Sequence, residues 1–417
     1  MKIPQFSKYA KLTQKLGVGQ IVFRATNKLI ASSPLASTCS RARALSSLGN
    51  HAAAEKSWAT LGWSAYSPAD FATRIVGLLK LQDWQTARRV GDEARSRGRA
   101  SLELELGLAE AAWRLDDELG RKEAIRHALL KLKNPSAAEI AFVKNLEFPP
   151  LAFARLKVLQ SVEKMLPEIL QIASDYETSP VPADWQPNAF VFWNSGLKSS
   201  PQMVQRCFEQ AQRQLGTERL NFLDDQTLPK WVNVPKPFDR VKQLWPAHYS
   251  DILRVSLLAR NGGIWLDSTI WTTEDVLAKF DDYVPGKFFA FAYNETRISS
   301  WFLMARPDSR IPKLMLAALE AHWRKAKRLD NYFLFHDIFE ALLLLDADFK
   351  AEWSQVPFRN ASDANRLGRY FLWQNFDEAK YSDSLARSPI QKLTYKFKNR
   401  PVGPETLAGK ILAGELS

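Results

Sequence analysis

One stretch of the chain, HYSDILRVSLLARNGGIWLDSTIWTT at residues 248–273, decides the expected fold. Its first half predicts a helix that carries Ser250, Asp251 and Arg254 and ends at the Asn-Gly-Gly of residues 261–263. Glycines at the end of a helical pattern are typical of a C-cap and a turn. The stretch therefore predicts a helix that turns sharply into the next element.

That next element is a short apolar strand, residues 264–266, with Asp267 directly after it. In an open α/β sheet, ligands bind outside the carboxyl ends of the strands. An acid at such a position, with Asp251 and Arg254 one helix earlier, suits a phosphorylated ligand and a divalent ion. The expected fold class is therefore α/β, with a ligand site at the end of this strand.

Each of these residues also has a purely structural interpretation. Gly262 and Gly263 could serve only the helix C-cap and turn, where a positive φ is needed. Asp251 and Arg254 stand at i and i+3, so they could simply pair on the helix surface. Asp267 could be a strand-end turn former. The order S-D-x-x-R, G-G, aromatic-Leu-Asp is more specific than any one of its members.

That order resembles the S-D-x-x-R…G-G-x-[YW]-x-D signature of bacterial capsular polysaccharide synthesis proteins, which are related to the DXD-type glycosyltransferases. Further segments are similar to the same family: FVFWNSG at 190–196 followed by PQMV at 201–204, NYFLFHD at 331–337 and SPIQKLTY at 388–395. The resemblance covers about residues 186–400 and implies a GT-A glycosyltransferase fold that binds a nucleotide-sugar.

The chain departs from the wider superfamily at the metal motif. The usual Asp-x-Asp reads Asp267-Ser268-Thr269 here, so the second carboxylate is missing. Mg²⁺ or Mn²⁺ often needs only one or two carboxylates, because phosphates and waters fill the other positions. The hypothesis is a divalent metal site held by Asp267 and, through a bound water, by Thr269, which the nucleotide completes. The missing carboxylate leaves metal dependence open.

Sugar transfer needs the charge on the diphosphate leaving group neutralised, the anomeric centre stabilised and the acceptor hydroxyl positioned. The resemblance implies that Asp267 contacts metal or sugar and that Asp251 lies near the ribose or sugar. Arg254 could contact phosphate or Asp251 with two prongs. His248 and Tyr249 could also line the donor pocket. The predicted donor-binding residues are Ser250, Asp251, Arg254, Gly262, Gly263 and Trp193.

His336 and Asp337 form a second candidate catalytic pair. Neighbours on a helix point away from each other, so they are not a ready dyad. The alternative is a surface aspartate beside a half-buried histidine that packs against Phe335 and Phe339. The family resemblance favours the functional interpretation, with one of the two facing the sugar or the acceptor.

Size and composition limit the other classes of function. A chain of 417 residues is long for one hydrophobic core, so two domains are expected. Its two cysteines, Cys39 and Cys207, show neither metal-ligand spacing nor a disulfide framework, which fits a reducing compartment. An apolar run of membrane-spanning length is absent from the sequence. Serine-hydrolase elbow, Walker, zincin and dinucleotide motifs are also absent.

Charge is concentrated at the start of the chain, where the first acidic residue is Glu55. Lys8, Lys11 and Lys15 fall on one helical face, so residues 1–39 are predicted to be a basic amphipathic segment that docks on an anionic membrane surface or a protein partner. A signal peptide fits poorly, whereas a transit peptide and an ordinary solvated helix stay open. No nucleic-acid partner is expected, because the rest of the chain nearly balances in charge and lacks RNA-binding or finger signatures.

The remaining chain divides into a region with a helical pattern and a region in which strands and helices alternate. Residues 40–178 read as helices, and the similar segments that begin at Leu48 and Leu81, with a third near Leu115, predict either hairpin repeats of the tetratricopeptide kind or a plain bundle. A proline-rich linker at 176–187 leads to an α/β domain over 186–417. The strands expected there are residues 189–193, 220–223, 264–266, 288–293 and 300–305, and the long helices are 247–260, 312–327 and 332–345.

The sequence therefore predicts a helical accessory domain followed by a glycosyltransferase that extends a capsular or cell-surface polysaccharide or a lipid-linked glycan. The donor would be a UDP- or GDP-sugar, the anomeric configuration would be retained, and the place of action would be the cytoplasm or the cytoplasmic face of the inner membrane. Two alternatives stay open. One is a degenerate sugar-nucleotide-binding adaptor with a helical interaction domain, and the other is a sugar-phosphate transferase.

Overall fold

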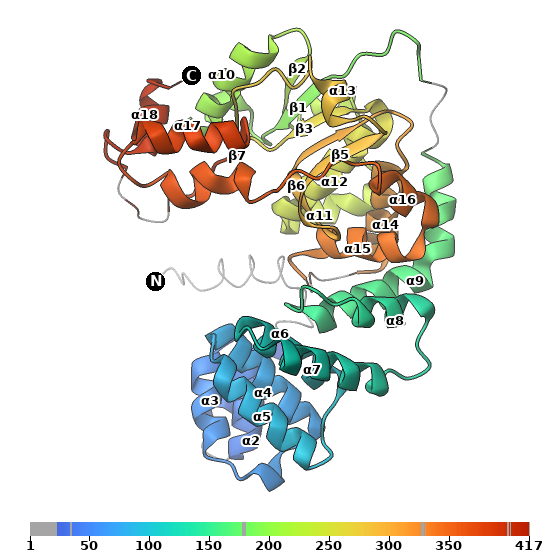
Figure 1. The fold of residues 1–417 in the computed structure, drawn as a ribbon, viewed down its shortest axis with the longest axis vertical. Coiled ribbons are helices and arrows are strands. Elements are labelled where there is room, and N and C mark those ends of the chain that lie inside the picture. The colour runs from blue at the N-terminus through green and yellow to red at the C-terminus, as the bar shows by residue number, and fades with distance from the viewer. Residues whose placement is uncertain are drawn as a thin grey trace, which may run out of the picture. The chain divides into compact units, whose positions relative to one another are not determined.

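The computed structural model describes residues 23–33, 36–176, 181–326, 329, 331–397, 400 and 402–416. Residues 23–32 are helical, but most of the predicted basic segment, including Lys8, Lys11 and Lys15, lies outside the described residues. By its contacts the chain divides into two compact units, 1–161 with 327–331 and 162–326 with 332–417 (Figure 1).

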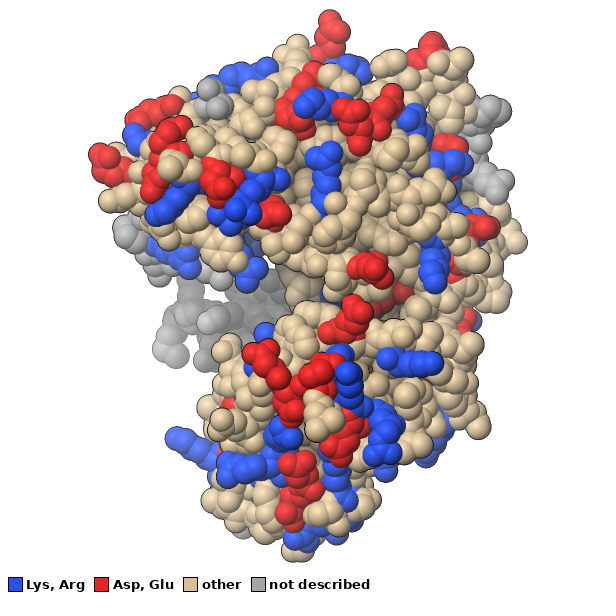
Figure 2. Space-filling view, viewed as in Figure 1, with Lys and Arg blue, Asp and Glu red and all other residues tan. Residues whose placement is uncertain are grey.

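The first unit is helical. Its helices are α2 (Thr38–Ser47), α3 (His51–Ala59), α4 (Pro68–Leu81), α5 (Trp84–Ser96), α6 (Leu102–Arg114), α7 (Glu118–Lys131), α8 (Ala137–Lys144) and the start of α9 (Ala152–Ser174). Neighbouring helices pair as hairpins, α2 with α3, α4 with α5 and α6 with α7 (Figure 1). Figure 2 shows acidic and basic side chains interspersed on the visible face of this unit rather than separated by sign.

The three hairpin turns share one local design. At each turn one residue adopts a positive φ, and these residues are Gly49 (79°), Gln82 (60°) and Asp116 (54°). The following residue caps the second helix by accepting a hydrogen bond from a backbone N–H, and these caps are Asn50, Asp83 and Asp117. Such caps satisfy N–H groups that have no partner within the helix. Helix hairpins are thus present at all three segments that the sequence singled out.

The second unit is an α/β unit around a five-stranded mixed sheet of order β2-β1-β3-β6-β5. Its strands are β1 (Ala189–Phe192), β2 (Leu220–Leu223), β3 (Gly263–Leu266), β5 (Phe288–Asn294) and β6 (Arg297–Ala305). Strand β1 pairs in parallel with both β2 and β3, whereas β6 pairs antiparallel with β3 and β5. Strand β3 is buried along its whole length, which explains why its sequence is apolar without alternation.

A second, two-stranded antiparallel sheet joins β4 (Ile270–Thr272) to β7 (Ile390–Lys392). Because β4 begins just after the end of β3, this pairing brings the late segment of the chain beside Asp267. The helices of the unit are the later part of α9, α10 (Gln202–Leu215), α11 (Asp239–Leu244), α12 (Pro246–Asn261), α13 (Phe280–Tyr283), α14 (Arg310–Lys325), α15 (Leu334–Leu345), α16 (Ala347–Trp353), α17 (Glu378–Arg387) and α18 (Leu407–Ala413).

The predicted succession of a helical region and an α/β region is confirmed. The division between the units falls at residues 161 and 162, inside α9, whereas the sequence placed the boundary in the proline-rich segment at 176–187. Pro167 lies within α9 without ending it. Within the described ranges, no helix has the length and apolar character needed to cross a bilayer.

Candidate functional site

The candidate site lies at the carboxyl end of β3. Asp267 follows the strand directly, and its backbone N–H donates to the carbonyl of Trp301 at 2.8 Å, which anchors it to β6. Because β1 runs parallel to β3, Trp193 at the end of β1 belongs to the same edge of the sheet. The Trp193 ring packs edge-on against the ring of Tyr395, 5.1 Å away between centroids.

Both carboxylate oxygens of Asp267 accept hydrogen bonds. Oδ1 accepts from Arg254 Nη2 at 3.1 Å and from Trp265 Nε1 at 3.0 Å, and Oδ2 accepts from Lys392 Nζ at 2.9 Å. Burial alone raises the pKa of Asp267, but the charges of Lys392 and Arg254 outweigh it and lower that pKa. The side chain keeps 24 % of its surface exposed, so Asp267 reaches the surface although both of its oxygens are hydrogen-bonded.

Arg254 connects the acids of the helix and the strand. It forms an ion pair with Asp251, donates to Ser250 Oγ at 3.2 Å, and reaches Asp267 with the same Nη2. Its guanidinium also lies over the rings of Trp265 and Phe335, 5.4 and 5.8 Å from their centroids. The Asp251–Arg254 pair is thus formed, but Arg254 is only 4 % exposed, so it is not the surface pair of the structural interpretation.

Asp251 differs from Asp267 in its protonation. Burial, against the opposing charge of Arg254 and together with the charge of Asp267, raises the pKa of Asp251 to about 6. The ring of His248, one turn earlier on α12, places Nδ1 3.8 Å from the second oxygen of Asp251. The site therefore contains one carboxylate that is ionised over a wide pH range and one that changes protonation just below neutral pH.

Two histidines beside Arg254 are held neutral. Burial, with the charges of Arg254 and His322, lowers the pKa of His248 to about 4. Burial, with the charges of Arg297, Arg254 and His248, lowers the pKa of His336 to about 3. Among the described residues, neither His248 Nε2 nor His336 Nδ1 has a hydrogen-bond partner, although both atoms are buried. Buried polar atoms are normally paired, so each could serve a ligand.

Asp337, the neighbour of His336 on α15, has a different environment. Its Oδ1 accepts a hydrogen bond from Arg297 Nη1 at 2.6 Å, and its side chain is 2 % exposed. The suggestion of a surface aspartate is therefore wrong, and Asp337 belongs to a buried ion pair between α15 and β6. His336 packs against the rings of Phe333 and Phe335. The catalytic role predicted for His336 and Asp337 stays a prediction.

Lys392 is the residue that the sequence did not assign. It lies in the family-like segment at 388–395, yet no role followed from its position there. Its Nζ donates to Asp267 Oδ2 at 2.9 Å and to Thr269 Oγ1 at 2.7 Å. A lysine 125 residues away from Asp267 becomes its neighbour only through the β4–β7 pairing, so spacing in the sequence could not reveal the contact.

The predicted metal site does not fit the residues present. The ammonium of Lys392 lies between Asp267 and Thr269, the two side chains proposed to hold the ion. Thr269 Oγ1 also donates to the carbonyl of Leu393 at 3.0 Å. Over the part of the chain described, no three His, Cys, Asp or Glu side chains are grouped to hold a metal ion. Divalent ions of this kind need oxygen ligands, and both oxygens of Asp267 are already bonded to Arg254, Trp265 and Lys392.

Gly262 and Gly263 lie at the other end of β3 from Asp267. Gly262 ends α12 with a φ of 65°, and Gly263 follows with a φ of 91°. A Cβ on Gly263 would stand 2.2 Å from the carbonyl oxygen of Asn188 on the way into β1. The pair is therefore required by backbone conformation and close packing. Their predicted contact with the donor stays a prediction.

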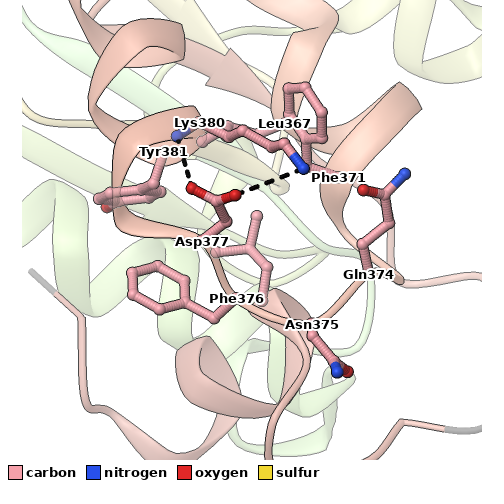
Figure 3. Close-up of a pocket in the computed structure, with 9 residues that line it drawn as sticks. Leu367, Phe371, Gln374, Asn375, Phe376, Asp377, Lys380 and Tyr381 are labelled. Carbon is pink, nitrogen blue, oxygen red and sulfur yellow. Dashed lines mark hydrogen bonds and ion pairs between the residues drawn. The ribbon is translucent and has the colours of Figure 1, made fainter.

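A small pocket near α17 is not part of this site. It is lined by residues such as Leu367, Phe371 and Tyr381, and holds about 10 Å³ of space (Figure 3). That is room for about one water molecule. Its polar contacts are internal to the helix, since Asp377 accepts from the backbone N–H of Lys380 and pairs with its ammonium (Figure 3).

Comparison with known proteins adds to this geometry. No curated protein and no solved structure matches the chain. The family model for capsular polysaccharide synthesis proteins matches residues 149–411, a range that contains the whole Asp267 cluster and all of α9. The match covers more than half of the 417 residues. The chain therefore belongs to the capsular polysaccharide synthesis protein family.

Proposed function

We propose that the protein transfers a sugar from a UDP- or GDP-sugar to a growing capsular or cell-surface polysaccharide or to a lipid-linked glycan. The observation that carries this proposal is the meeting of Asp251, Arg254, Asp267 and Lys392 at the carboxyl end of β3. Open α/β sheets bind ligands at this edge. Membership of a capsule-synthesis family supplies the context.

Two cations at the site suit a diphosphate leaving group. Transfer breaks the bond between the anomeric carbon and a phosphate oxygen, and it forms a bond from the anomeric carbon to the acceptor hydroxyl oxygen. The diphosphate gains negative charge as it leaves, and preorganised positive groups lower the barrier most when they face such developing charge. Arg254 and Lys392 are the groups that we assign to this task. Arg254 is held by Asp251 and stacked on two rings, so its orientation is set before the ligand arrives.

The two acids take separate parts in the same proposal. Asp267 stays ionised and supports the positive charge that builds at the anomeric centre. Asp251, whose pKa is raised to about 6 by burial, is mostly ionised at neutral pH and can receive the proton of the acceptor hydroxyl. A retained anomeric configuration belongs to the proposal through the family resemblance alone.

The neutral histidines suit the sugar rather than the phosphate. An uncharged imidazole has one donor and one acceptor nitrogen, which matches a hydroxyl group. His248 Nε2 and His336 Nδ1 are buried with no described partner, and both rings lie close enough to Arg254 for its charge to affect their pKa values. We assign them to hydroxyl recognition on the donor sugar.

Substitution of Asp267 tests the transferase proposal directly. A panel of UDP- and GDP-sugars is incubated with the protein and acceptor glycans, and products are identified by mass spectrometry. We expect Asp267→Ala to lower transfer by at least about a hundredfold while the circular dichroism spectrum stays unchanged, because a charged group facing the transition state is lost. Turnover at the wild-type rate in that variant would remove Asp267 from the chemistry.

A binding role without transfer is the second candidate function. It is favoured by one observation, that both oxygens of Asp267 are already bonded to Arg254, Trp265 and Lys392. Calorimetric binding of a nucleotide-sugar without any product in the same panel would support it. A product that contains a phosphodiester would instead indicate sugar-phosphate transfer.

The basic N-terminal segment is proposed to dock the protein on an anionic membrane surface or a partner protein. Lys8, Lys11 and Lys15 lie before the described residues, so the proposal rests on their spacing in the sequence. Deletion of residues 1–22, which contain Lys8, Lys11 and Lys15 and end before the first described helix, should weaken co-sedimentation with vesicles that contain anionic lipid, and neutral vesicles are the control. Equal sedimentation of the deleted and full-length proteins would contradict the proposal.

A further inference from the structure

The position between Asp267 and Thr269 is occupied by a side chain of the protein itself. Lys392 Nζ stands 2.9 Å from Asp267 Oδ2 and 2.7 Å from Thr269 Oγ1. These are hydrogen-bond distances to the two oxygens that an Asp-x-Asp-like site would offer to a cation. The ammonium thus has the charge and the oxygen neighbours of a bound ion.

The backbone fixes this placement. In the β4–β7 ladder Lys392 is opposite Ile270, the residue that follows Thr269. The next residue, Leu393, donates its N–H to the carbonyl of Thr269 at 2.9 Å and accepts from Thr269 Oγ1 at 3.0 Å. Gln391 is fully buried and bonded through its side chain to neighbouring backbone. Lys392 is therefore carried by a rigid strand rather than by a loose loop.

The ammonium also has capacity left for a ligand. It carries three N–H donors, and Asp267 and Thr269 accept from two of them. Its side chain keeps 22 % of its surface exposed, close to the 24 % of Asp267. An anionic ligand that approaches the exposed part of Asp267 therefore also meets Lys392.

A divalent ion would have to displace this lysine and then share Asp267 with Arg254. Arg254 Nη2 lies 3.1 Å from Asp267 Oδ1, so the lone carboxylate already balances two positive charges. The residue two positions after Asp267, where an Asp-x-Asp motif would place a second carboxylate, is the uncharged Thr269. Charge balance disfavours two additional positive charges there.

We propose that Lys392 does the work of the divalent metal in this protein, so that nucleotide diphosphates bind through Lys392 and Arg254 without a metal ion. The inference rests on the proposed function and identifies the class of ligand as a nucleoside diphosphate or its sugar ester. The net positive charge that a second carboxylate and a divalent ion would otherwise bring to the site is then supplied by the ammonium of Lys392 beside Thr269.

Calorimetric titration of UDP and of GDP into the full-length protein tests the inference. Each titration is run in EDTA and again in Mn²⁺, and a separate titration uses Mn²⁺ alone. The variant Lys392→Met removes the ammonium and keeps a chain of similar length. The matched control is Lys410→Met, because Lys410 lies in the same unit, is 26 % exposed and pairs with Glu415 at the same 2.9 Å.

We expect one of the two nucleotides to bind the wild-type protein with the same affinity, within about threefold, in EDTA and in Mn²⁺, and Mn²⁺ alone not to bind. Lys392→Met should weaken nucleotide binding by about ten- to a hundredfold, the usual cost of a lost charge-assisted hydrogen bond. Lys410→Met should bind as the wild type does.

Three results would count against the inference, and they differ in what they say of the proposed function. Binding that needs Mn²⁺ in the wild type overturns the lysine exchange and leaves the transferase proposal supported. Metal-independent binding that Lys392→Met does not weaken removes Lys392 from the ligand. No binding of either nucleotide under any condition overturns both proposals. The wild-type comparison decides even if Lys392→Met fails to fold, which circular dichroism shows.

Discussion

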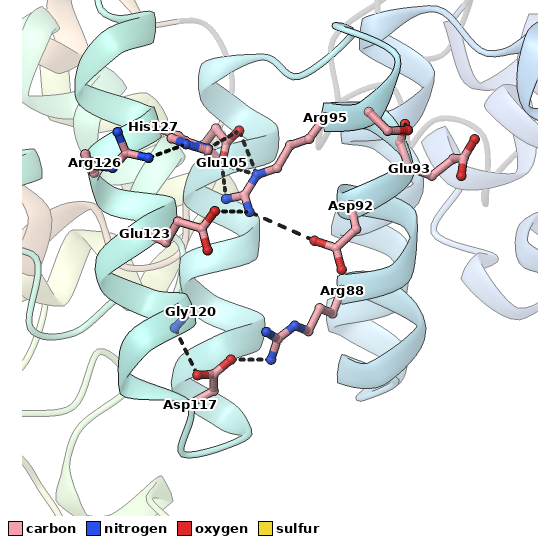
Figure 4. A network of polar contacts seen from close by, with 11 residues as sticks. Arg88, Asp92, Glu93, Arg95, Glu105, Asp117, Gly120, Glu123, Arg126 and His127 are labelled. Atoms are coloured by element: carbon pink, nitrogen blue, oxygen red, sulfur yellow. Dashed lines mark hydrogen bonds and ion pairs between the residues drawn. The ribbon is translucent and has the colours of Figure 1, made fainter.

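Each unit of the molecule contains a carboxylate that forms an ion pair with an arginine, and the two ion-pair clusters differ in exposure and in their further partners. In the helical unit Glu105 of α6 is 1 % exposed and pairs with Arg95 of α5, at 2.6 Å for the shortest contact (Figure 4). His127 of α7 places Nδ1 3.7 Å from the same carboxylate. In the α/β unit Asp267 is 24 % exposed and has two cationic partners, Arg254 and Lys392.

The difference distinguishes an ion-pair cluster that joins helices from an ion-pair cluster that a ligand can contact. The partners of Glu105 come from the adjacent helices, and the network of Figure 4 continues among side chains of the same unit, with Arg95 also near Asp92 and Glu123. Around Asp267 one cation, Arg254, comes from the preceding helix and the other, Lys392, lies 125 residues away in the sequence. The carboxylate side chain is partly exposed, and two imidazole nitrogens nearby have no described partner. Unused polar capacity, rather than the ion pair itself, distinguishes the candidate site.

The largest effect on stability should come from removing the buried ion pair between Glu105 and Arg95 in the helical unit. We expect Glu105→Gln to lower the free energy of unfolding of this unit by about 3 kcal/mol, because it leaves Arg95 without its buried counter-charge. The same substitution type at Asp267, Asp267→Asn, should cost about 1 kcal/mol or less, because water reaches that side chain. Urea unfolding with pulsed hydrogen exchange measures both, on peptides of α6 and of β3.

The control for this comparison is Glu93→Gln. Glu93 pairs with Arg97 one turn later in the helix that also carries Arg95, but both side chains are partly exposed. An exposed pair of this kind contributes about 0.2–1 kcal/mol. If Glu105→Gln lowered the free energy of unfolding no more than Glu93→Gln does, the buried ion pair would stabilise the unit no more than an exposed one. The contrast with Asp267 would then be contradicted.

Much of the fold could be predicted because the signals are local. The strand expected at 220–223 is found as β2 with the same bounds, and the helix expected at 247–260 is α12, Pro246–Asn261. Apolar runs and caps act over a few residues, so one sequence suffices to find them. The contact-based division inside α9 lies earlier than the proline-rich segment, because prolines mark where the local sequence pattern changes and carry no information about the packing of a helix.

The site could be predicted only as far as one continuous segment reaches. Asp251, Arg254 and Asp267 lie on one helix and the next strand, so their meeting follows from a helix that returns into the sheet. Lys392 was missed because its contact depends on the register of β4 with β7. Arg297, the partner of Asp337, was missed for the same reason, since β6 and α15 are joined only by tertiary packing. Long-range pairs of charges need the fold before they can be seen.

The second-largest expected effect is a change in stability with pH that arises from His336, one of the two histidines with a nitrogen that has no described partner. His336 has its pKa lowered to about 3 in the folded protein, chiefly by burial, from an ordinary value of 6.5. Its neutral form is thus favoured by folding, so its contribution is fully present above pH 6.5. That contribution is lost as pH falls from 6.5 towards 3, because only the unfolded chain takes up the proton. At pH 5 we expect a loss of about 2 kcal/mol from this residue.

The variant His336→Phe isolates that contribution. It keeps a ring in place and removes the titration, so stability of the α/β unit should fall less between pH 7.5 and pH 5 than in the wild type. Asp251 works in the opposite direction, since a carboxyl pKa raised to about 6 gives stability that is lost as pH rises from about 4 to 6. Equal pH dependence of β3 protection in wild type and variant would show that His336 is not held neutral by the fold.

The smallest effect belongs to the turns of the helical unit. Asp83 caps α5 by accepting from the backbone N–H of Thr86 at 3.1 Å. Removal of such a cap in Asp83→Ala should cost about 1 kcal/mol in the same unfolding assay. Asp117 caps α7 in the equivalent turn and also pairs with Arg88 (Figure 4), so Asp117→Ala should cost more by the value of one partly exposed ion pair.

Neither cap variant should change the affinity for UDP or GDP, because these carboxylates already have partners within the helical unit. If a cap variant also weakened nucleotide binding, the helical unit would contribute to the site. The two ion-pair clusters could then no longer be treated as independent. If only the hydrogen-exchange protection of α5 or α7 fell, these charged groups would stabilise the helical unit without affecting ligand binding. Ligand binding would then depend on the carboxyl end of β3, where a partly exposed carboxylate and two cations lie near buried imidazole nitrogens that have no partner among the described residues.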